Sequence, residues 1–174
     1  MPDETSLQEA VEASHKVRLQ QGREETLWEK GDFLQFSLGN ELYAFETKEI
    51  QEIIPSPKIT HVPTAPEYVL GVFHNRGVIV PAIDLGGLLG LSHTTPLASG
   101  VRCVIIQAGK DAVAFIPDSI IGVMGLPVRA VESPLPAPSV EAGFVKGQIR
   151  LKDKIVVILD ARAILEGSKI KAVR

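Results

Sequence analysis

Two aspartates are the side chains best placed to do chemistry in this chain of 174 residues. Asp84 and Asp160 each follow an apolar strand pattern, at 78–83 and 154–159, and each precedes a short helical pattern. Two carboxylates can serve as general acid and general base in a hydrolase. An aspartate at the start of a helix more commonly accepts hydrogen bonds from backbone N–H groups as an N-cap. No histidine, serine or cysteine stands at a matched spacing to complete a nucleophilic set. We therefore interpret both aspartates as helix caps and expect no enzymatic activity, with an Asp-dependent hydrolase as the alternative.

The remaining reactive side chains do not form a recognisable site. His61, His74 and His93 lack the spacing of metal ligands and have no cysteine partners. The single cysteine, Cys103, lies inside the apolar run 101–106, which is typical of a buried structural residue. No G-x-x-x-x-G-K-[ST] or G-x-G-x-x-G motif is present. The sequence therefore predicts neither a metal nor a cofactor.

Charge is unevenly distributed along the chain. Residues 1–30 hold seven Asp and Glu against four Lys and Arg, whereas residues 31–174 hold 14 of each. Nucleic-acid surfaces are basic, and oligonucleotide-binding barrels interleave basic with aromatic residues, so the neutral body argues against a nucleic-acid partner. No apolar stretch reaches about 18 residues, and the acidic N-terminus lacks the apolar core of a signal peptide. These features predict a cytoplasmic protein that does not insert into a membrane.

One pattern occurs twice in the chain. At an offset of 76, residues 69–90 match residues 145–166 without a gap, so that Gly71 corresponds to Gly147 and Asp84 to Asp160. At an offset of 70, an upstream segment that begins at Gly39 matches one that begins at Gly109. Two copies are too few for a solenoid, so the repeat predicts two small subdomains related by a pseudo-twofold axis around one core.

Short strands with turn residues between them position these side chains. The alternation of apolar and polar residues, with Gly and Pro at the turns, is typical of paired small barrels. We expect a polar arm at 1–30, disordered or marginally helical, then the double-barrel domain at 31–168 and a tail at 169–174. The expected strands span 33–38, 41–46, 58–62, 68–73, 78–83, 101–107, 111–116, 120–126, 144–151 and 154–159, and helical turns are expected at 47–54, 85–89 and 160–166.

Residues 71–85 read GVFHNRGVIVPAIDL and resemble the signature of CheW-like domains, G-V-x-N-L-R-G-x-I-V-P-V-I-D-L. Segments at 50–53, 59–63 and 65–69 are also similar to that family, and the resemblance covers residues 33–166. It implies a mainly β fold of two five-stranded, SH3-like barrels packed on a shared core, with short helices. It also implies a non-catalytic adaptor of bacterial chemotaxis at membrane receptor arrays. Such an adaptor couples the cytoplasmic tips of chemoreceptors to the regulatory domain of a CheA-type histidine kinase.

The sequence departs from the family pattern at two places. Of the family's N-L-R-G, only Arg76 and Gly77 remain, after His74 and Asn75. Gly86 and Gly87 replace the longer polar residues that usually follow D-L. Either departure can change the choice of partner, so an auxiliary CheW-like scaffold of a non-chemotactic receptor array is the alternative function.

The resemblance also implies where the partners bind. For the receptor it implies a groove between the barrels, lined by Ile50, Ile53, Gly71 and Arg76, with Glu52 pairing Arg76 as a structural contact. A lone surface arginine is usually a solvated charge, so this is the alternative for Arg76, but the family pattern favours the pairing. Ile50 and Ile53 can be core or groove residues, and Gly71 can mark a bulge as well as a close approach of a helix.

The expected kinase surface lies on the first barrel. It is placed along strands 41–46 and 58–62, where the family pattern and the alternation of faces suggest three exposed side chains. These are Tyr43, Lys58 and Thr60.

Overall fold

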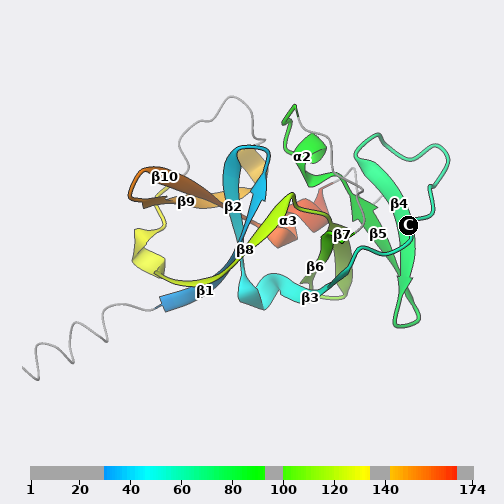
Figure 1. Ribbon diagram of the computed structural model, residues 1–174, viewed down its shortest axis with the longest axis horizontal. Coiled ribbons are helices and arrows are strands. Elements are labelled where there is room, and N and C mark those ends of the chain that lie inside the picture. Colours follow the sequence, from blue (N-terminus) through cyan, green and yellow to red (C-terminus); the bar gives the residue numbers. More distant parts are fainter. Residues whose placement is uncertain (1–29, 93–99, 134–141, 168–174) are drawn as a thin grey trace, which may run out of the picture.

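The computed structural model describes residues 30–92, 100–133 and 142–167, and the predicted arm and tail lie largely outside these residues (Figure 1). The strands are β1 (Lys30–Leu38), β2 (Glu41–Glu46), β3 (Ile50–Pro55), β4 (Val69–Asn75), β5 (Val78–Ile83), β6 (Arg102–Ala108), β7 (Asp111–Phe115), β8 (Ser119–Pro127), β9 (Val145–Leu151) and β10 (Lys154–Leu159). The short helices are η1 (Thr47–Glu49), α2 (Leu85–Leu88), η2 (Val128–Ala130), η3 (Ala142–Phe144) and α3 (Ala161–Glu166).

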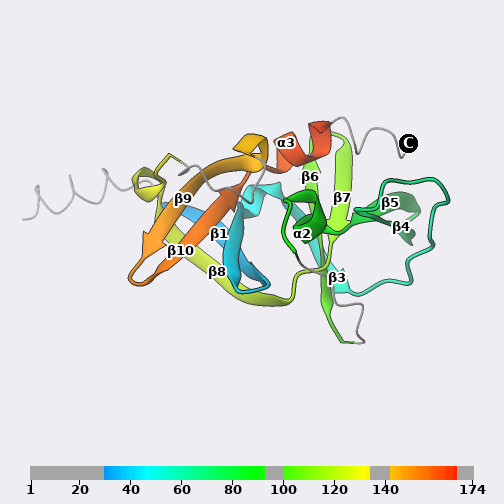
Figure 2. The same cartoon turned by 90° about the horizontal axis from the view of Figure 1, so that it is seen from above.

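The strands form two five-stranded sheets. We call them sheet one, ordered β8-β1-β2-β10-β9, and sheet two, ordered β3-β6-β7-β5-β4. Figures 1 and 2 show the sheets at opposite ends of the long axis, with α2 and α3 between them. In each sheet the segment after one edge strand makes a single bridge to the other edge, Thr60 to Val72 and Glu132 to Gln148. The predicted mainly β fold of two five-stranded units is confirmed.

The two copies of the repeat exchange strands. The first copy runs from β1 to β5 and the second from β6 to β10, yet each sheet takes strands from both copies. Shifting β1 and β2 by 70 residues gives β6 and β7, and shifting β4 and β5 by 76 gives β9 and β10. The parallel pairs correspond as well, since Ala44 lies opposite Ile158 and Ala114 lies opposite Ala82. The predicted pseudo-twofold repeat is confirmed, but neither sheet is one half of the chain.

Two elements expected from the sequence are wrong. Residues 50–55 form a strand, β3, after a helical turn that ends at Glu49. The isoleucine spacing fits a helix, but β-branched side chains favour a strand when a partner is present, and β6 supplies one. Residues 58–62 form only the bridge at Thr60, because Pro57 and Pro63 flank the segment and cannot donate to a ladder.

The buried apolar side chains form three clusters, one of which holds the two sheets together. The largest, which we call the shared core, lies between the sheets and is built from repeat-related pairs such as Leu34 and Val104. Its centre is aromatic: the ring of Phe36 lies 4.9 Å from that of Phe115 and 5.7 Å from that of Phe45. The other two clusters fill the inner face of each sheet. The cluster in sheet two contains Cys103, and burial raises the pKa of this thiol to about 12, in agreement with a structural role.

A charged cluster ties η1 to the second half of the chain. The Lys146 ammonium lies 2.7 Å from Glu46 and 3.3 Å from Glu49. Glu49 also accepts a hydrogen bond from the backbone N–H of Ala161, the first residue of α3. The chain passes between the sheets twice, through η1 and between β7 and β8. These contacts, which we call the Lys146 cluster, hold the first of these two crossovers.

The Lys146 cluster makes stability depend on pH. Burial alone raises the pKa of Glu46, but hydrogen bonds from Lys146 and Lys48 outweigh it and hold the pKa below its ordinary value of 4.5. A lowered carboxyl pKa contributes stability that is present above the ordinary value and is lost as the pH falls through the folded-state value. We expect Lys146→Met to lower the free energy of unfolding by about 1 kcal/mol at neutral pH and by less in acid. Urea unfolding at both pH values measures this, and an equal loss at both contradicts it.

Candidate functional site

Two exposed β-branched side chains mark an apolar border of the shared core. Ile53 on β3 is 38% exposed and lies opposite the buried Val104, and Val123 on β8 is 60% exposed and lies opposite the buried Leu34. Directly opposite residues of antiparallel strands share a face, so both side chains lie on the side of the shared core. They extend it to the surface along two edge strands. We call Ile53, Val123 and the neighbouring Ile121 the border patch.

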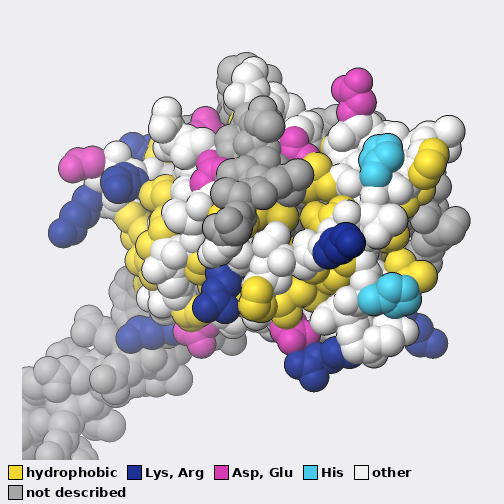
Figure 3. Space-filling view, turned by 45° about the vertical axis from the view of Figure 1, so that its right-hand side comes forward, with side chains coloured by type: hydrophobic (Ala, Val, Ile, Leu, Met, Phe, Trp, Pro, Cys, Tyr) yellow, Lys and Arg dark blue, Asp and Glu magenta, His cyan; other side chains and the backbone are white. Residues whose placement is uncertain are grey.

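A β-bulge adds Ile121 to the border patch. The register of β8 against β1 shifts between Ile120 and Gly122, so Ile121 is the extra residue and is 52% exposed. The equivalent bulge on β3 exposes the polar Gln51. The patch is therefore more apolar on β8 than on β3. Figure 3 shows hydrophobic side chains gathered over the middle of the molecule on one face.

The structure does not leave Gly71 open to a partner. Gly71 is buried, and a Cβ atom there would lie 2.2 Å from the carbonyl oxygen of Thr60. The chain's own segment at 59–60 occupies the space that we expected a receptor helix to use. The bridge between Thr60 and Val72 holds that segment in place with hydrogen bonds of 2.8 and 2.9 Å. The backbone at Gly71 is therefore less open than we expected, and the space beside Gly147 is filled in the same way by Val131 and Glu132.

The turn between β4 and β5 pairs Arg76 with Glu52. Arg76 and Gly77 both have positive φ, which suits a two-residue type I′ hairpin turn. The Arg76 guanidinium donates two hydrogen bonds, of 2.8 and 3.2 Å, to the Glu52 carboxylate. Asn75 donates a third, at 3.2 Å. Asn75 stands where the family pattern has leucine. This departure therefore adds a hydrogen bond between the turn and Glu52 on β3. Ile50, at the start of β3, packs on the shared core.

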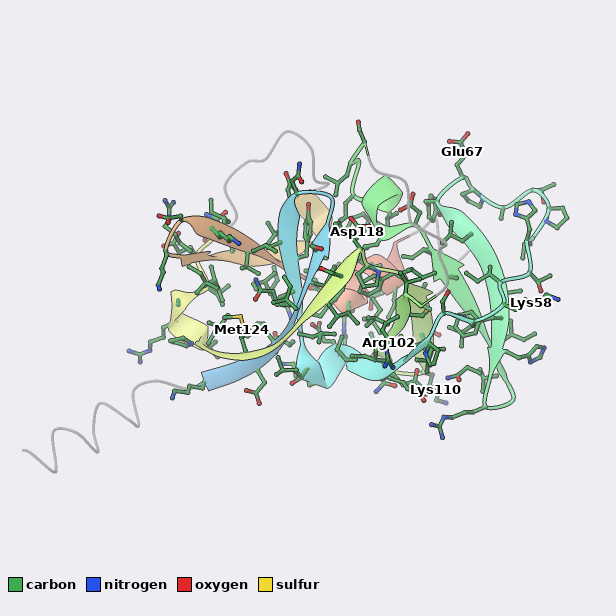
Figure 4. All side chains as sticks on the ribbon, viewed as in Figure 1. Lys58, Glu67, Arg102, Lys110, Asp118 and Met124 are labelled. Carbon is green, nitrogen blue, oxygen red and sulfur yellow. The ribbon has the colours of Figure 1, made fainter. Side chains whose placement is uncertain are left out.

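The three residues expected to face the kinase do not share a surface. Tyr43 is fully buried in the shared core, and its hydroxyl donates to Glu41, so its expected exposure is wrong. Both faces of β2 are covered, because the strand lies between the shared core and the inner cluster of sheet one. Lys58 and Thr60 are exposed and belong to sheet two. They line a groove of about 420 Å³ with Val72, Phe73, His74, Ile79 and Pro57, and Figure 4 shows Lys58 beside β4.

The two aspartates begin equivalent helices. The Asp160 carboxylate accepts a hydrogen bond of 3.0 Å from the backbone N–H of Ala163, as an N-cap does. Asp84 occupies the same position before α2 but makes no such side-chain bond to its helix. Among the described residues, no group of three histidine, cysteine, aspartate or glutamate side chains is placed to hold a metal. None of the described helices is long and apolar enough to cross a membrane.

Comparison with known proteins decides the family. The model of the CheW-like domain matches residues 32–169, which is most of the chain. The chain belongs to the CheW-like domain family. A chemotaxis protein CheW of Thermotoga maritima is 28% identical over 144 residues, covering 80% of this chain and 91% of the relative. A chemotaxis protein CheW of Klebsiella aerogenes is 26% identical over 146 residues, covering 82% and 86%.

A solved structure supports the CheW-like fold. The scaffolding protein TtCheW from Thermoanaerobacter tengcongensis superposes with a TM-score of 0.69 at 27% identity. The superposition covers 75% of this chain and 84% of TtCheW. The CheW-like domain identified from the signature at 71–85 is therefore confirmed.

Sequence reasoning missed Ile121 and Val123 as surface residues of this CheW-like domain. The apolar residues of β8 are typical of a strand that packs on a core, so the pattern gives no sign that some of them are exposed. The signal that could have exposed them is the repeat, because Ile53 and Val123 are equivalent at an offset of 70 and Ile53 was already a surface candidate.

The Glu52 carboxylate provides a direct test of the turn. The hydrogen bond from Arg76, helped by Asn75, holds the pKa of Glu52 below its ordinary value. The paired form is present above the ordinary pKa and is lost as the pH falls through the lowered one. We expect Arg76→Gln to raise the pKa of Glu52, measured by NMR titration of its side-chain carboxyl carbon. Lys152→Gln, in the equivalent turn of the other sheet, should leave the Glu52 titration unchanged, and an unchanged titration in Arg76→Gln contradicts the pairing.

Proposed function

We propose that this chain is a non-catalytic adaptor that couples chemoreceptors to a CheA-type histidine kinase in bacterial chemotaxis. The observation that carries the proposal is the border patch, an exposed apolar surface on two edge strands of a CheW-like domain. Exposed apolar patches in a folded domain mark surfaces that bind other proteins. The relatives named as chemotaxis proteins CheW and the scaffolding protein TtCheW support the same role.

The border patch is the proposed receptor surface. The cytoplasmic tip of a chemoreceptor is a helical hairpin, and an apolar strip accepts the apolar face of a helix. Ile53 and Val123 supply that strip from two strands, and Ile121 widens it. Arg76 acts at a distance in this proposal, because it holds β3 through Glu52. Gly71 allows segment 59–60 to pack closely against β4, and in this proposal it has no direct contact with the receptor.

The proposed kinase surface is the groove at the end of sheet two. Lys58, Thr60 and Ile79 all line it. Ile79 is 60% exposed at the start of β5, so the groove has an apolar rim beside a basic side chain. This surface and the border patch share no residue, as an adaptor that binds two partners at once requires.

A second candidate function is an auxiliary scaffold in a non-chemotactic receptor array. Asn75 replaces an apolar residue of the family pattern and binds Glu52, and His74 lines the groove beside it. Both changes fall next to the proposed partner surfaces. The hydrolase alternative has less support, because the Asp160 carboxylate is engaged in capping α3. Either adaptor role places the protein at the cytoplasmic face of receptor arrays.

Titration of the isotope-labelled protein tests the proposal. The partners are the regulatory domain of the CheA-type kinase and the receptor tips from the same genome. We expect amide shifts at β3 and β8 with a receptor tip, shifts around 58–60 and 79 with the kinase domain, and a ternary complex when both are present. Binding of neither partner, or competition between them, contradicts a coupling role. Binding only to receptor tips of a non-chemotactic system selects the auxiliary scaffold.

A further inference from the structure

The outer end of sheet one carries an excess of positive charge. Arg150, Lys152 and Lys154 are exposed along the β9–β10 hairpin, and Arg129 is exposed on η2. We call these four residues the basic end. Among the described residues none of the four takes part in an ion pair. The carboxylates of the same segments are Asp153 and Glu132, so basic charge exceeds acidic charge there.

Apolar side chains accompany this charge. Val128 on η2 is 45% exposed, and Ile155 on β10 is 43% exposed. The segment after η2 runs along β9, because Glu132 forms a bridge with Gln148. The basic end therefore combines basic and apolar groups on neighbouring segments. Figure 3 shows Lys and Arg side chains gathered at the left-hand end of the molecule.

The described chain begins beside the basic end. Lys30, the first residue of β1, lies opposite Pro127, the residue just before η2. Figures 1 and 2 both show η2 next to the start of β1. Residues 1–29 precede this point and hold seven acidic against three basic side chains. They also carry Leu27 and Trp28 immediately before β1, together with Leu7 and Val11 further away.

We propose that the acidic segment 1–29 of the same chain docks on the basic end and covers it. The charge of the segment is opposite to that of the surface. The segment also carries apolar side chains that can pack against Val128 and Ile155. The reach is sufficient: the seven residues of β9 span roughly 23 Å, which about a dozen extended residues exceed. Tethering gives the segment an effective concentration on the order of millimolar, so weak contacts suffice.

The cover gives the two ends of the molecule different properties. The equivalent hairpin of sheet two, β4–β5, exposes Val78 and Ile79 and has no acidic segment attached to it. An acidic partner that binds the basic end must displace residues 1–29, whereas a partner of the β4–β5 hairpin does not compete with this segment. The segment therefore competes intramolecularly at one end alone, and this role is independent of the proposed coupling function.

Paramagnetic relaxation in the full-length protein tests the docking. A spin label is attached at Ala10→Cys, since the native Cys103 is fully buried and its thiol pKa is raised. At about 20 mM salt we expect loss of amide signal intensity at residues 150–155, and recovery at about 0.5 M salt, where charges are screened within roughly 4 Å. The hairpin 74–79 is the matched internal control and should keep its signals.

Two variants and one mixing experiment test whether the contact depends on these charges and whether it forms within one molecule. The triple variant Arg150→Gln, Lys152→Gln, Lys154→Gln should restore the signals of residues 150–155 in the labelled protein. Replacing Glu24, Glu25 and Glu29 by glutamine tests the other side of the same contact and should weaken the effect. Equal signal loss in both hairpins, or signal loss that survives the triple variant, overturns the proposal. Signal loss in an isotope-labelled protein mixed with a separate spin-labelled copy assigns the contact to a second molecule and also overturns it.

Discussion

Replacing Gly71 by alanine should destabilise the fold by about 3 kcal/mol, because overpacking and backbone strain each contribute roughly 1–3 kcal/mol. The new Cβ atom would lie 2.2 Å from the Thr60 carbonyl oxygen and 2.8 Å from the Ile59 side chain. The φ angle of +143° is in addition one that residues with a side chain rarely adopt. Urea unfolding followed by circular dichroism measures the loss. The expected value is a large part of a typical domain stability of about 5–15 kcal/mol.

Gly122 is a matched control for this substitution. Its φ angle of +147° is nearly the same, but a Cβ atom there would meet nothing within 4 Å. Gly122→Ala therefore carries the backbone strain without the collision, and we expect it to cost about 1–2 kcal/mol. The difference between the two variants isolates the contact with Thr60. Equal losses would mean that segment 59–60 moves aside freely. The surface of β4 beside Gly71 would then be open to a partner.

Replacing Val123 by glutamate should weaken binding of a receptor tip by about tenfold or more, which corresponds to about 1.4 kcal/mol. The side chain is 60% exposed, so the free energy of unfolding should change by less than about 0.5 kcal/mol. The new carboxylate has to be desolvated when an apolar helix face lies on the border patch, and that cost appears only in the complex. Isothermal titration with a receptor-tip fragment measures the change.

Ile155 is the matched control for Val123. It is another exposed β-branched residue of sheet one, but it lies on the β9–β10 hairpin, away from the border patch. Ile155→Glu should leave receptor binding unchanged, and Ile53→Glu should weaken it as Val123→Glu does. Normal binding by both border variants, with a loss in Ile155→Glu, would move the receptor surface to the end of the molecule.

Local patterns predict strands that have one clear face or clear boundaries. The strands β2 and β5 begin and end where the sequence places them, at 41–46 and 78–83, because turn residues flank both. The same local reasoning fails at 50–55, where the isoleucine spacing suits a helix and a strand equally. The decision comes from β6, which is about 50 residues further along the chain and offers an edge for pairing.

The site residues were harder to predict for a related reason. Alternation identifies which residues share a face, but it cannot say that both faces of β2 are covered, so Tyr43 was misplaced on the surface. It also cannot say that one apolar face of β8 extends beyond the core, so Val123 was missed. The pairing of Arg76 with Glu52 was predictable only from the family resemblance, since 24 residues separate them.

The exchange of strands between the two copies has a consequence for biosynthesis and ancestry. Sheet one is complete only when β10 has joined β2, so more than 100 residues of chain must be synthesised before its hydrogen bonds can close. Such non-local pairing slows folding and leaves sheet edges exposed during synthesis. Two separate molecules of a single repeat, exchanging strands in the same manner, would build the same pair of sheets as a symmetric homodimer. Fusion of the two genes would replace a concentration-dependent association by the folding of one chain. Each copy of the repeat could then evolve a different binding surface.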